Sequence, residues 1–242
     1  MEFTKYSSTL LCSIMLSAFL HHSVYGQNSE ENEYGSWFVL CGTTKIHKDW
    51  SVPAVGILKH NHMVDKYGFF FFRTGASYHI SSASTVTGGM ALLNSNSYLE
   101  QNDVVNTNQI WFYGEYTLKS KIHGQSISQR VRFENRRLIH TEDPKTNNRI
   151  RYRLQYVRPL YKDVYLKAFD EVFLNMEGTT FSQNRIFFGV GRQLTKNLKG
   201  DIGYFNRRFR NSSENMIRLG LTFQFDLTDN DLAGLPHTDI NN

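Results

Sequence analysis

Charged and apolar residues alternate in two stretches of this chain, on either side of a polar loop at residues 140–148. Alternate positions carry Arg130, Arg132, Glu134 and Arg136 in the first stretch and Arg149, Arg151 and Arg153 in the second. The positions between them are mostly large and apolar: Val131, Phe133, Ile150, Tyr152 and Leu154. A period of two predicts β-strands, because a helix would spread the arginines around its whole circumference. We therefore expect a hairpin with one cationic face and one apolar face.

The contrast between these two faces is larger than in an ordinary half-buried strand. It is typical of a transmembrane β-barrel, in which one face of each strand contacts lipid and the other faces a polar lumen. Like charges directly opposite each other destabilise a strand pair, so the arginines need acidic partners from other strands. The acids that alternation places on the inner face are Glu115, Glu171, Asp201 and Asp226.

Alternation of varying regularity divides the chain into about eleven predicted strands, at 36–46, 51–60, 68–80, 85–94, 109–121, 129–136, 149–156, 164–175, 184–194, 198–210 and 217–227. Most are roughly 10–13 residues long, near the length that a tilted strand needs to cross a bilayer. Strands of soluble proteins average about 5–6 residues. Two details resist the pattern: the run of four phenylalanines at 69–72 has no readable phase, and Asp170 falls on the outward face.

Short and longer connections alternate along the chain, as they do in bacterial outer-membrane barrels. The sequence therefore predicts an all-β fold, a closed antiparallel up-and-down transmembrane β-barrel. Single-chain bacterial barrels have an even number of strands. We accordingly expect twelve strands, one of them hidden within residues 27–66, and keep ten as the alternative.

The first residues have the features of a secretory signal peptide. Lys5 supplies a positive charge, residues 10–20 form a short apolar core, and residues 24–26 offer a cleavage site. The predicted organisation is a signal peptide at 1–26, a barrel at 27–227 and a polar tail at 228–242. The predicted location is the bacterial outer membrane.

Charge and composition exclude several other classes of protein. The net charge of +5 suggests an anionic partner, but the arginines alternate along strands instead of clustering, so we expect no nucleic acid. Cys41 is the one cysteine after the signal, which excludes an intramolecular disulfide or a cysteine metal cluster. His60 and His62 lack a third ligand at suitable spacing. We expect neither a metal nor a cofactor.

The order of several motifs resembles that of a family of uncharacterised outer-membrane β-barrels from Gram-negative bacteria, classed as a domain of unknown function. The matching features are the Arg130, Arg132, Glu134, Arg136 strand, Arg149-Ile150-Arg151-Tyr152, Asp170-Glu171-Val172-Phe173, Asn184-Arg185-Ile186 and Gly203-Tyr204. The similarity extends from about Trp37 to Leu227. It implies the fold and the location of the protein but supplies no catalytic residue.

The predicted function is that of a structural barrel or a narrow, porin-like pore with an arginine-rich lumen. The charge ladder comprises Arg130, Arg132, Glu134, Arg136, Arg149, Arg151, Arg153, Glu115 and Glu171. Ion pairs that fill a narrow lumen explain these residues better than a dedicated ligand site. The expected partners are outer-membrane lipid, the barrel-assembly machinery and a small anionic solute.

Two alternatives remain open at this point. The first is an outer-membrane acyl hydrolase or acyltransferase, with His79 or His123 as base and Ser120 or Ser126 as nucleophile, although no G-x-S-x-G motif is present. We consider a role other than catalysis the better prediction. The second is a soluble, secreted lipid-binding barrel, in which the apolar faces would point inward and the arginines outward.

Overall fold

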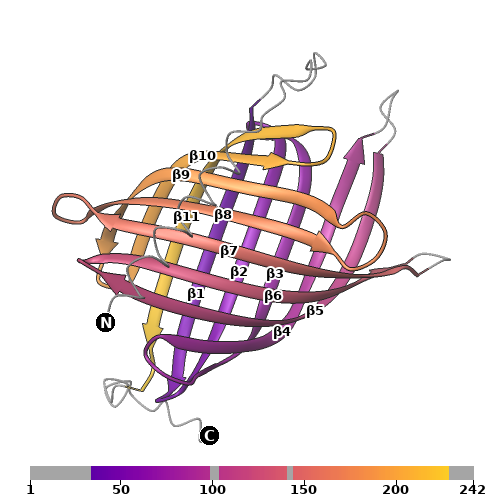
Figure 1. The fold of residues 1–242 in the computed structure, drawn as a ribbon. Helices are drawn as coiled ribbons and strands as arrows, with labels where there is room; N and C mark the ends of the chain where they lie inside the picture. The colour runs from indigo at the N-terminus through magenta and orange to yellow at the C-terminus, as the bar shows by residue number, and fades with distance from the viewer. Residues whose placement is uncertain (1–33, 99–103, 141–143, 229–242) are drawn as a thin grey trace, which may run out of the picture. The chain divides into compact units, whose positions relative to one another are not determined.

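A computed structural model describes residues 34–98, 104–140 and 144–228. The predicted signal peptide at 1–26 and residues 229–242 of the predicted tail lie outside the described residues. The described residues form an all-β closed barrel with strongly tilted strands (Figure 1), which confirms the predicted fold class. No helix in the described ranges is long and apolar enough to cross a membrane.

Each predicted strand appears in the structure, and most are extended by a few residues, while β10 ends two residues earlier than predicted. The strands are β1 (Gly35–His47), β2 (Trp50–His62), β3 (Asp65–His79), β4 (Ser84–Tyr98), β5 (Val104–Ile122), β6 (Gln125–Ile139), β7 (Thr146–Pro159), β8 (Val164–Asn175), β9 (Phe181–Thr195), β10 (Leu198–Arg208) and β11 (Ser213–Asp226). Their length of 11 to 19 residues reflects long alternating segments that only turn residues interrupt.

Closure of the barrel differs from the expected arrangement. Consecutive strands pair antiparallel, but β1 pairs with β11 in parallel, from Gly35 opposite Met216 to Lys45 opposite Asp226. The described residues contain eleven strands, one fewer than the twelve we expected and one more than the alternative of ten, and no additional strand lies between residues 34 and 66. In an up-and-down chain with an odd number of strands, the first and last run in the same direction. Their pairing must therefore be parallel.

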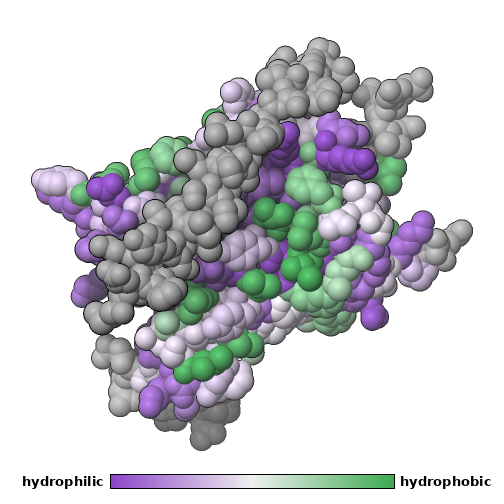
Figure 2. Space-filling model, viewed as in Figure 1, coloured by the Kyte–Doolittle hydropathy of each residue, from purple (hydrophilic) through white to green (hydrophobic). Residues whose placement is uncertain are grey.

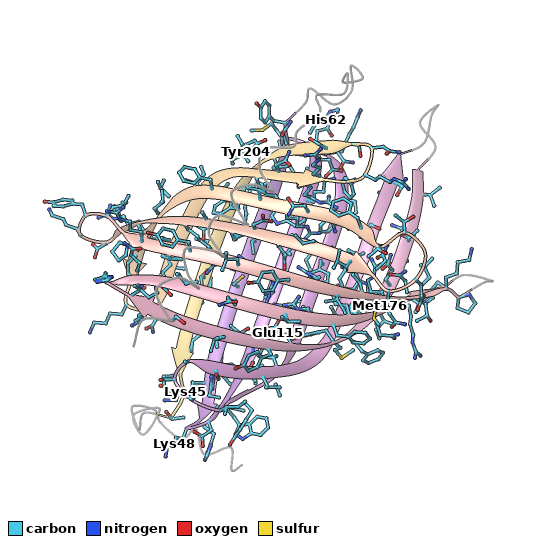
Figure 3. The ribbon with its side chains drawn as sticks, in the orientation of Figure 1. Lys45, Lys48, His62, Glu115, Met176 and Tyr204 are labelled. Atoms are coloured by element: carbon cyan, nitrogen blue, oxygen red, sulfur yellow. The ribbon has the colours of Figure 1, made fainter. Side chains whose placement is uncertain are left out.

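The two ends of the barrel carry different connections. At the end called here the tight-turn end, connections of two to four residues join β1 to β2, β3 to β4, β5 to β6, β7 to β8 and β9 to β10. The other connections lie at the opposite end, called here the loop end; three of them have five or six residues, while β2–β3 has two and β10–β11 has four. Figure 3 labels Lys48, in the turn after β1, and His62, at the end of β2, at opposite ends of the barrel.

The phenylalanine run at 69–72 shares one register with the rest of β3 up to Tyr78, and an irregularity between β2 and β3 lies just before it. Lys59 is opposite Phe69 but His60 is opposite Tyr67, so one extra residue on β3 forms a bulge. Phe71 shares the inner face with Arg73 and Ser77 and is buried in the barrel, whereas Phe70 and Phe72 are exposed on its outer surface. Figure 2 shows patches of hydrophobic residues on the outer face that is in view.

Two pairs of glycines face each other across neighbouring strands on the inside of the barrel. Gly75 lies opposite Gly89, and a Cβ atom on either would come within 2.8 Å of the Tyr113 hydroxyl. Gly189 lies opposite Gly203, where an added Cβ on Gly203 would collide with the Phe188 carbonyl oxygen and the Gly189 Cα. These positions let the backbone and the Tyr113 ring pack more closely than any side chain would allow.

Candidate functional site

The structure brings the nine residues of the charge ladder together inside the barrel. Their side chains come from four consecutive strands, β5 to β8. The most deeply buried of them are Glu134, Arg132, Arg149, Glu171 and Arg151. Burial of this many charged groups is costly unless each is paired, so the pairing pattern decides what the cluster does.

Glu134 is the centre of the network. Its side chain is 1% exposed, and its carboxylate accepts hydrogen bonds from Arg149 Nη2 at 2.6 Å and from Arg151 Nη1 at 2.5 Å. Arg132 Nη1 lies 3.6 Å from the same carboxylate. One carboxylate therefore offsets part of the positive charge of three buried arginines, which lie on two strands.

Glu115 and Glu171 pair with further members of the ladder. Glu115 accepts hydrogen bonds from both Nε and Nη2 of Arg132, the first at 2.7 Å. Glu171 accepts from Arg130 Nη2 at 2.6 Å and from Arg151 Nη2 at 2.9 Å. Figure 3 labels Glu115 between the two ends of the barrel, and these pairs link strands β5 to β8 along one wall.

The inner face also carries charged residues that the predicted ladder did not include. They are Lys59, Arg73, Lys167, Arg185, Arg207, Asp201, Glu214 and Arg218, contributed by strands on both sides of the ladder. Asp201 pairs with Lys167 at 2.8 Å and with Arg218, as its predicted inward orientation allowed. Asp226 instead lies exposed at the tight-turn end, where it pairs with Lys45, so it is not a partner of the ladder. The same alternation that identified the ladder assigns most of these residues to the inner face. Asp201 was predicted there, and the others were left out because they do not repeat within one strand.

A row of charged residues crosses six neighbouring strands in register. In order from β6 to β11 its members are Arg130, Arg153, Glu171, Arg185, Arg207 and Glu214. Glu214 pairs with Arg207 at 2.8 Å and with Lys59 at 3.0 Å. The row thus contains four cations and two carboxylates, and both carboxylates are already shared between two cations each.

Three arginines on the inner face have no carboxylate within 4.0 Å among the described residues: Arg136, Arg153 and Arg185. Arg153 lies 3.8 Å from the centre of the Phe169 ring, and Arg185 lies over the rings of Phe173 and Trp37 at 4.5 and 5.1 Å. The Nε atoms of Arg136, Arg151 and Arg153 are buried without a hydrogen-bond partner in the described part of the chain. Aromatic faces offset part of the cost of these charges, but they leave hydrogen-bond donors unsatisfied.

These side chains line a cavity of about 890 Å³ inside the barrel. Its lining reaches the loop end, at Ser97 and Phe209, and includes Arg130 and Arg218 near mid-barrel. Cationic side chains outnumber carboxylates on its wall by far. Twelve lysines and arginines line it, together with Glu171 and Glu214: Lys59, Arg73, Arg130, Arg132, Arg136, Arg149, Arg151, Arg153, Lys167, Arg185, Arg207 and Arg218.

The residues considered for catalysis do not assemble into one site. His79 contacts Ser51, with Nε2 at 2.9 Å from its hydroxyl, and Thr85, with Nδ1 at 3.1 Å. Alternation on β5 places Ser120 on the outer face, while His123 lies in a turn. The Ser51–His79 pair has a hydroxyl in the position where a catalytic triad has a carboxylate. Among the described residues, no group of three His, Cys, Asp or Glu side chains is arranged to hold a metal ion.

Asp170 faces outward, as alternation predicted, and the barrel accommodates it without a local bulge. It accepts a hydrogen bond from the Asn184 amide at 2.5 Å across β8 and β9. The bulge in this strand pair lies further along, between Phe173 and Leu174. A neighbouring amide, and not a change of phase, therefore accounts for an acid on the apolar face.

The fold and the interior define this protein as a closed β-barrel that is lined by charged residues and covered by apolar ones. The chain belongs to a family described as Protein of unknown function (DUF2490), whose model matches residues 34–218. The resemblance to a family of unknown function is thereby confirmed. A search of curated proteins found no match to the chain.

Proposed function

We propose that this protein is an outer-membrane β-barrel whose lumen is narrowed by ion-paired arginines and whose cationic cavity accepts anions. The observation that carries the proposal is the polarity of the wall. Buried arginines and glutamates face inward, and large apolar side chains are exposed on the outer surface of β1, β3 to β7 and β9 to β11. An apolar surface of this extent on a monomer marks contact with a membrane or a partner.

The apolar band has about the height of an outer-membrane hydrocarbon layer. On β11 the outward residues from Ile217 to Phe225 are all apolar, and Asn215 follows beyond the band toward the loop end. At a rise of roughly 3.3 Å per residue and a tilt of about 40°, this stretch covers about 20 Å, against about 25 Å for known barrels.

Paired asparagines border the band at the loop end. Asn94 donates to Asn108 at 2.8 Å, Asn135 to Asn148 at 2.8 Å and Asn206 to Asn215 at 2.9 Å, each pair joining register partners on neighbouring strands. At the tight-turn end the outer rings of Trp50 and Tyr78 lie 5.1 Å apart. Amides and amphipathic aromatic rings at these levels support a membrane–water boundary at each end.

The alternative of a soluble lipid-binding barrel requires the opposite polarity. In the structure the arginines are inside and residues such as Phe133 and Leu219 are exposed outside. This arrangement favours the membrane proposal over the soluble one.

Replacing Leu221, in the middle of the band, with arginine is expected to cost about 2–4 kcal/mol of insertion free energy. Asn215→Arg on the same strand and face serves as the control and is expected to cost about 0–1 kcal/mol, because it lies at the boundary. The measurement is the yield of protein that fractionates with the outer membrane and changes gel mobility on boiling. Wild-type protein in the soluble fraction, or equal yields for the two variants, would contradict the proposal.

The narrowed lumen predicts small, anion-preferring currents in planar bilayers. Combining Arg132→Ala with Arg151→Ala is expected to enlarge the conductance, because two long side chains leave the centre of the lumen. It should also shift the preference toward cations, since Glu115 and Glu134 each lose a partner. Conductance and selectivity that both stay unchanged would show that these residues do not line the conducting path.

A further inference from the structure

The cavity at the loop end has two chemically different walls. In the closed strand order, β2 and β7 lie on opposite sides of the barrel. The wall formed by β1 to β4 is largely apolar and includes Val39, Val55, Ile57, Phe69, Phe71 and Leu93. The wall formed by β6 to β9 carries seven arginines and Lys167, whereas β1 to β4 contribute two cations, Lys59 and Arg73. A ligand that fits both walls needs an apolar part and an anionic part.

Arg185 has the weakest polar contact of the arginines on the wall of β6 to β9. Its Nε donates one long hydrogen bond, 3.4 Å to Gln183 Oε1, and its terminal nitrogens have no hydrogen-bond partner among the described residues. Its neighbour in register, Arg207, is in contrast paired with Glu214 at 2.8 Å. Arg185 therefore presents a planar pair of donors, the geometry that binds a carboxylate or a phosphate group, to the cavity.

The size of the cavity agrees with a molecule larger than an inorganic anion. Its volume of about 890 Å³ lies at the upper end of the range of roughly 300–1,000 Å³ that is usual for small-molecule sites. A phosphate or chloride ion would satisfy the arginines but would leave the wall of Val55, Ile57 and Phe71 against water. An apolar chain covers that wall and gains the free energy of its burial.

From these features we propose that the cavity binds an amphiphilic anion, with its carboxylate or phosphate headgroup on Arg185 and its apolar chain along the wall of β1 to β4. The inference deepens the proposed function by naming the class of anion. Arg153, the second arginine of the register row without a carboxylate partner, extends the cationic surface beyond the headgroup.

Tryptophan fluorescence offers a direct test, because Trp37 and Trp111 line the cavity and Trp50 lies on the outer surface. The protein is purified in a non-ionic detergent with the Trp50→Phe substitution, which removes the outer reporter. The probe is 11-bromoundecanoate, whose bromine quenches a tryptophan that it contacts. Its methyl ester tests the same chain without the charge, and inorganic phosphate tests the charge without the chain.

We expect saturable quenching by the acid, non-saturable quenching by the ester and no displacement by phosphate at equal concentration. Arg185→Gln should weaken binding of the acid about tenfold or more, the usual consequence of losing a charge-assisted hydrogen bond. Arg207→Gln removes the same charge at the neighbouring register position, but from a paired arginine, and should weaken binding less than about threefold. Arg185→Lys, which keeps a charge, should restore part of the affinity.

Equal quenching by acid and ester, or equal effects of Arg185→Gln and Arg207→Gln, would overturn the inference. Displacement of the acid by phosphate at equal concentration would show an anion site without a role for the chain and would also overturn it. Boiled and unboiled gel mobility verifies that each variant is folded. Because binding is measured on purified protein, its failure leaves the membrane location to the fractionation experiment, and the two proposals fail independently.

Discussion

Replacing Glu134 with glutamine is expected to destabilise the barrel by about 3–5 kcal/mol. The carboxylate lies within 4.0 Å of Arg132, Arg149 and Arg151 in the barrel interior, and removing one member of a buried ion network leaves the others uncompensated. The free energy of unfolding can be measured by denaturant titration of the protein in detergent. The gel band that has the mobility of the boiled, unfolded protein serves as an independent probe.

Two further variants make this measurement specific. Glu177→Gln neutralises an exposed glutamate that accepts a hydrogen bond from Asn148, and it should change stability by less than about 0.5 kcal/mol. Combining Glu134→Gln with Arg149→Gln removes one of the arginines that lost its carboxylate partner, and it should recover part of the lost stability. A Glu134→Gln protein as stable as the Glu177→Gln protein would show that the ion network does not hold the barrel together.

Gly203→Ala is expected to destabilise the barrel by about 3 kcal/mol, or to prevent its closure. A Cβ at this position meets the backbone of Phe188 and Gly189, and backbone cannot rotate away as a side chain can. Relief would require β9 and β10 to move apart, which would disturb the strand register on both sides. The readouts are the same unfolding titration and the yield of the heat-modifiable folded band.

The barrel contains a matched control for this substitution. Gly88 and Gly114 also face each other across two strands, but a Cβ on either meets nothing within 4 Å. Gly114→Ala should therefore raise stability by roughly 0.5–1 kcal/mol, because alanine loses less backbone entropy than glycine in a strand. Opposite signs for the two alanines would establish close inner packing as the cause, whereas equal effects would refute it.

Much of the candidate site was readable from alternation. A strand has a side-chain period of two, so Arg130, Arg132 and Glu134 had to share a face wherever the strand lay. The difference in polarity between the two faces then indicated which of them turned inward. The same rule placed Glu115, Glu171 and Asp201 inside, and the structure shows Glu171 and Asp201 deeply buried with cationic partners.

The partners within that site were not readable from the sequence. Register across β6 to β11 brings Arg185 beside Glu171 although Arg130 and Arg151 occupy that carboxylate. Which arginine remains uncompensated depends on distances between side chains of strands far apart in the chain. Local periodicity carries no information about such distances. The cavity and the lack of a carboxylate partner for Arg185 among the described residues were therefore visible only in the structure.

The sequence by itself determined the secondary structure, the inner and outer faces of most strands and the resemblance to the family, because each rests on a repeat within one segment. Only the tertiary structure decided the closure of the barrel and the bulge that precedes the phenylalanines at 69–72. Closure depends on whether the total number of strands is odd or even, and here an odd number makes β1 and β11 parallel. The bulge consists of a single extra residue of β3, Gly68, between the partners of Lys59 and His60. Both are properties of strand pairing, and pairing exists only once the strands have met.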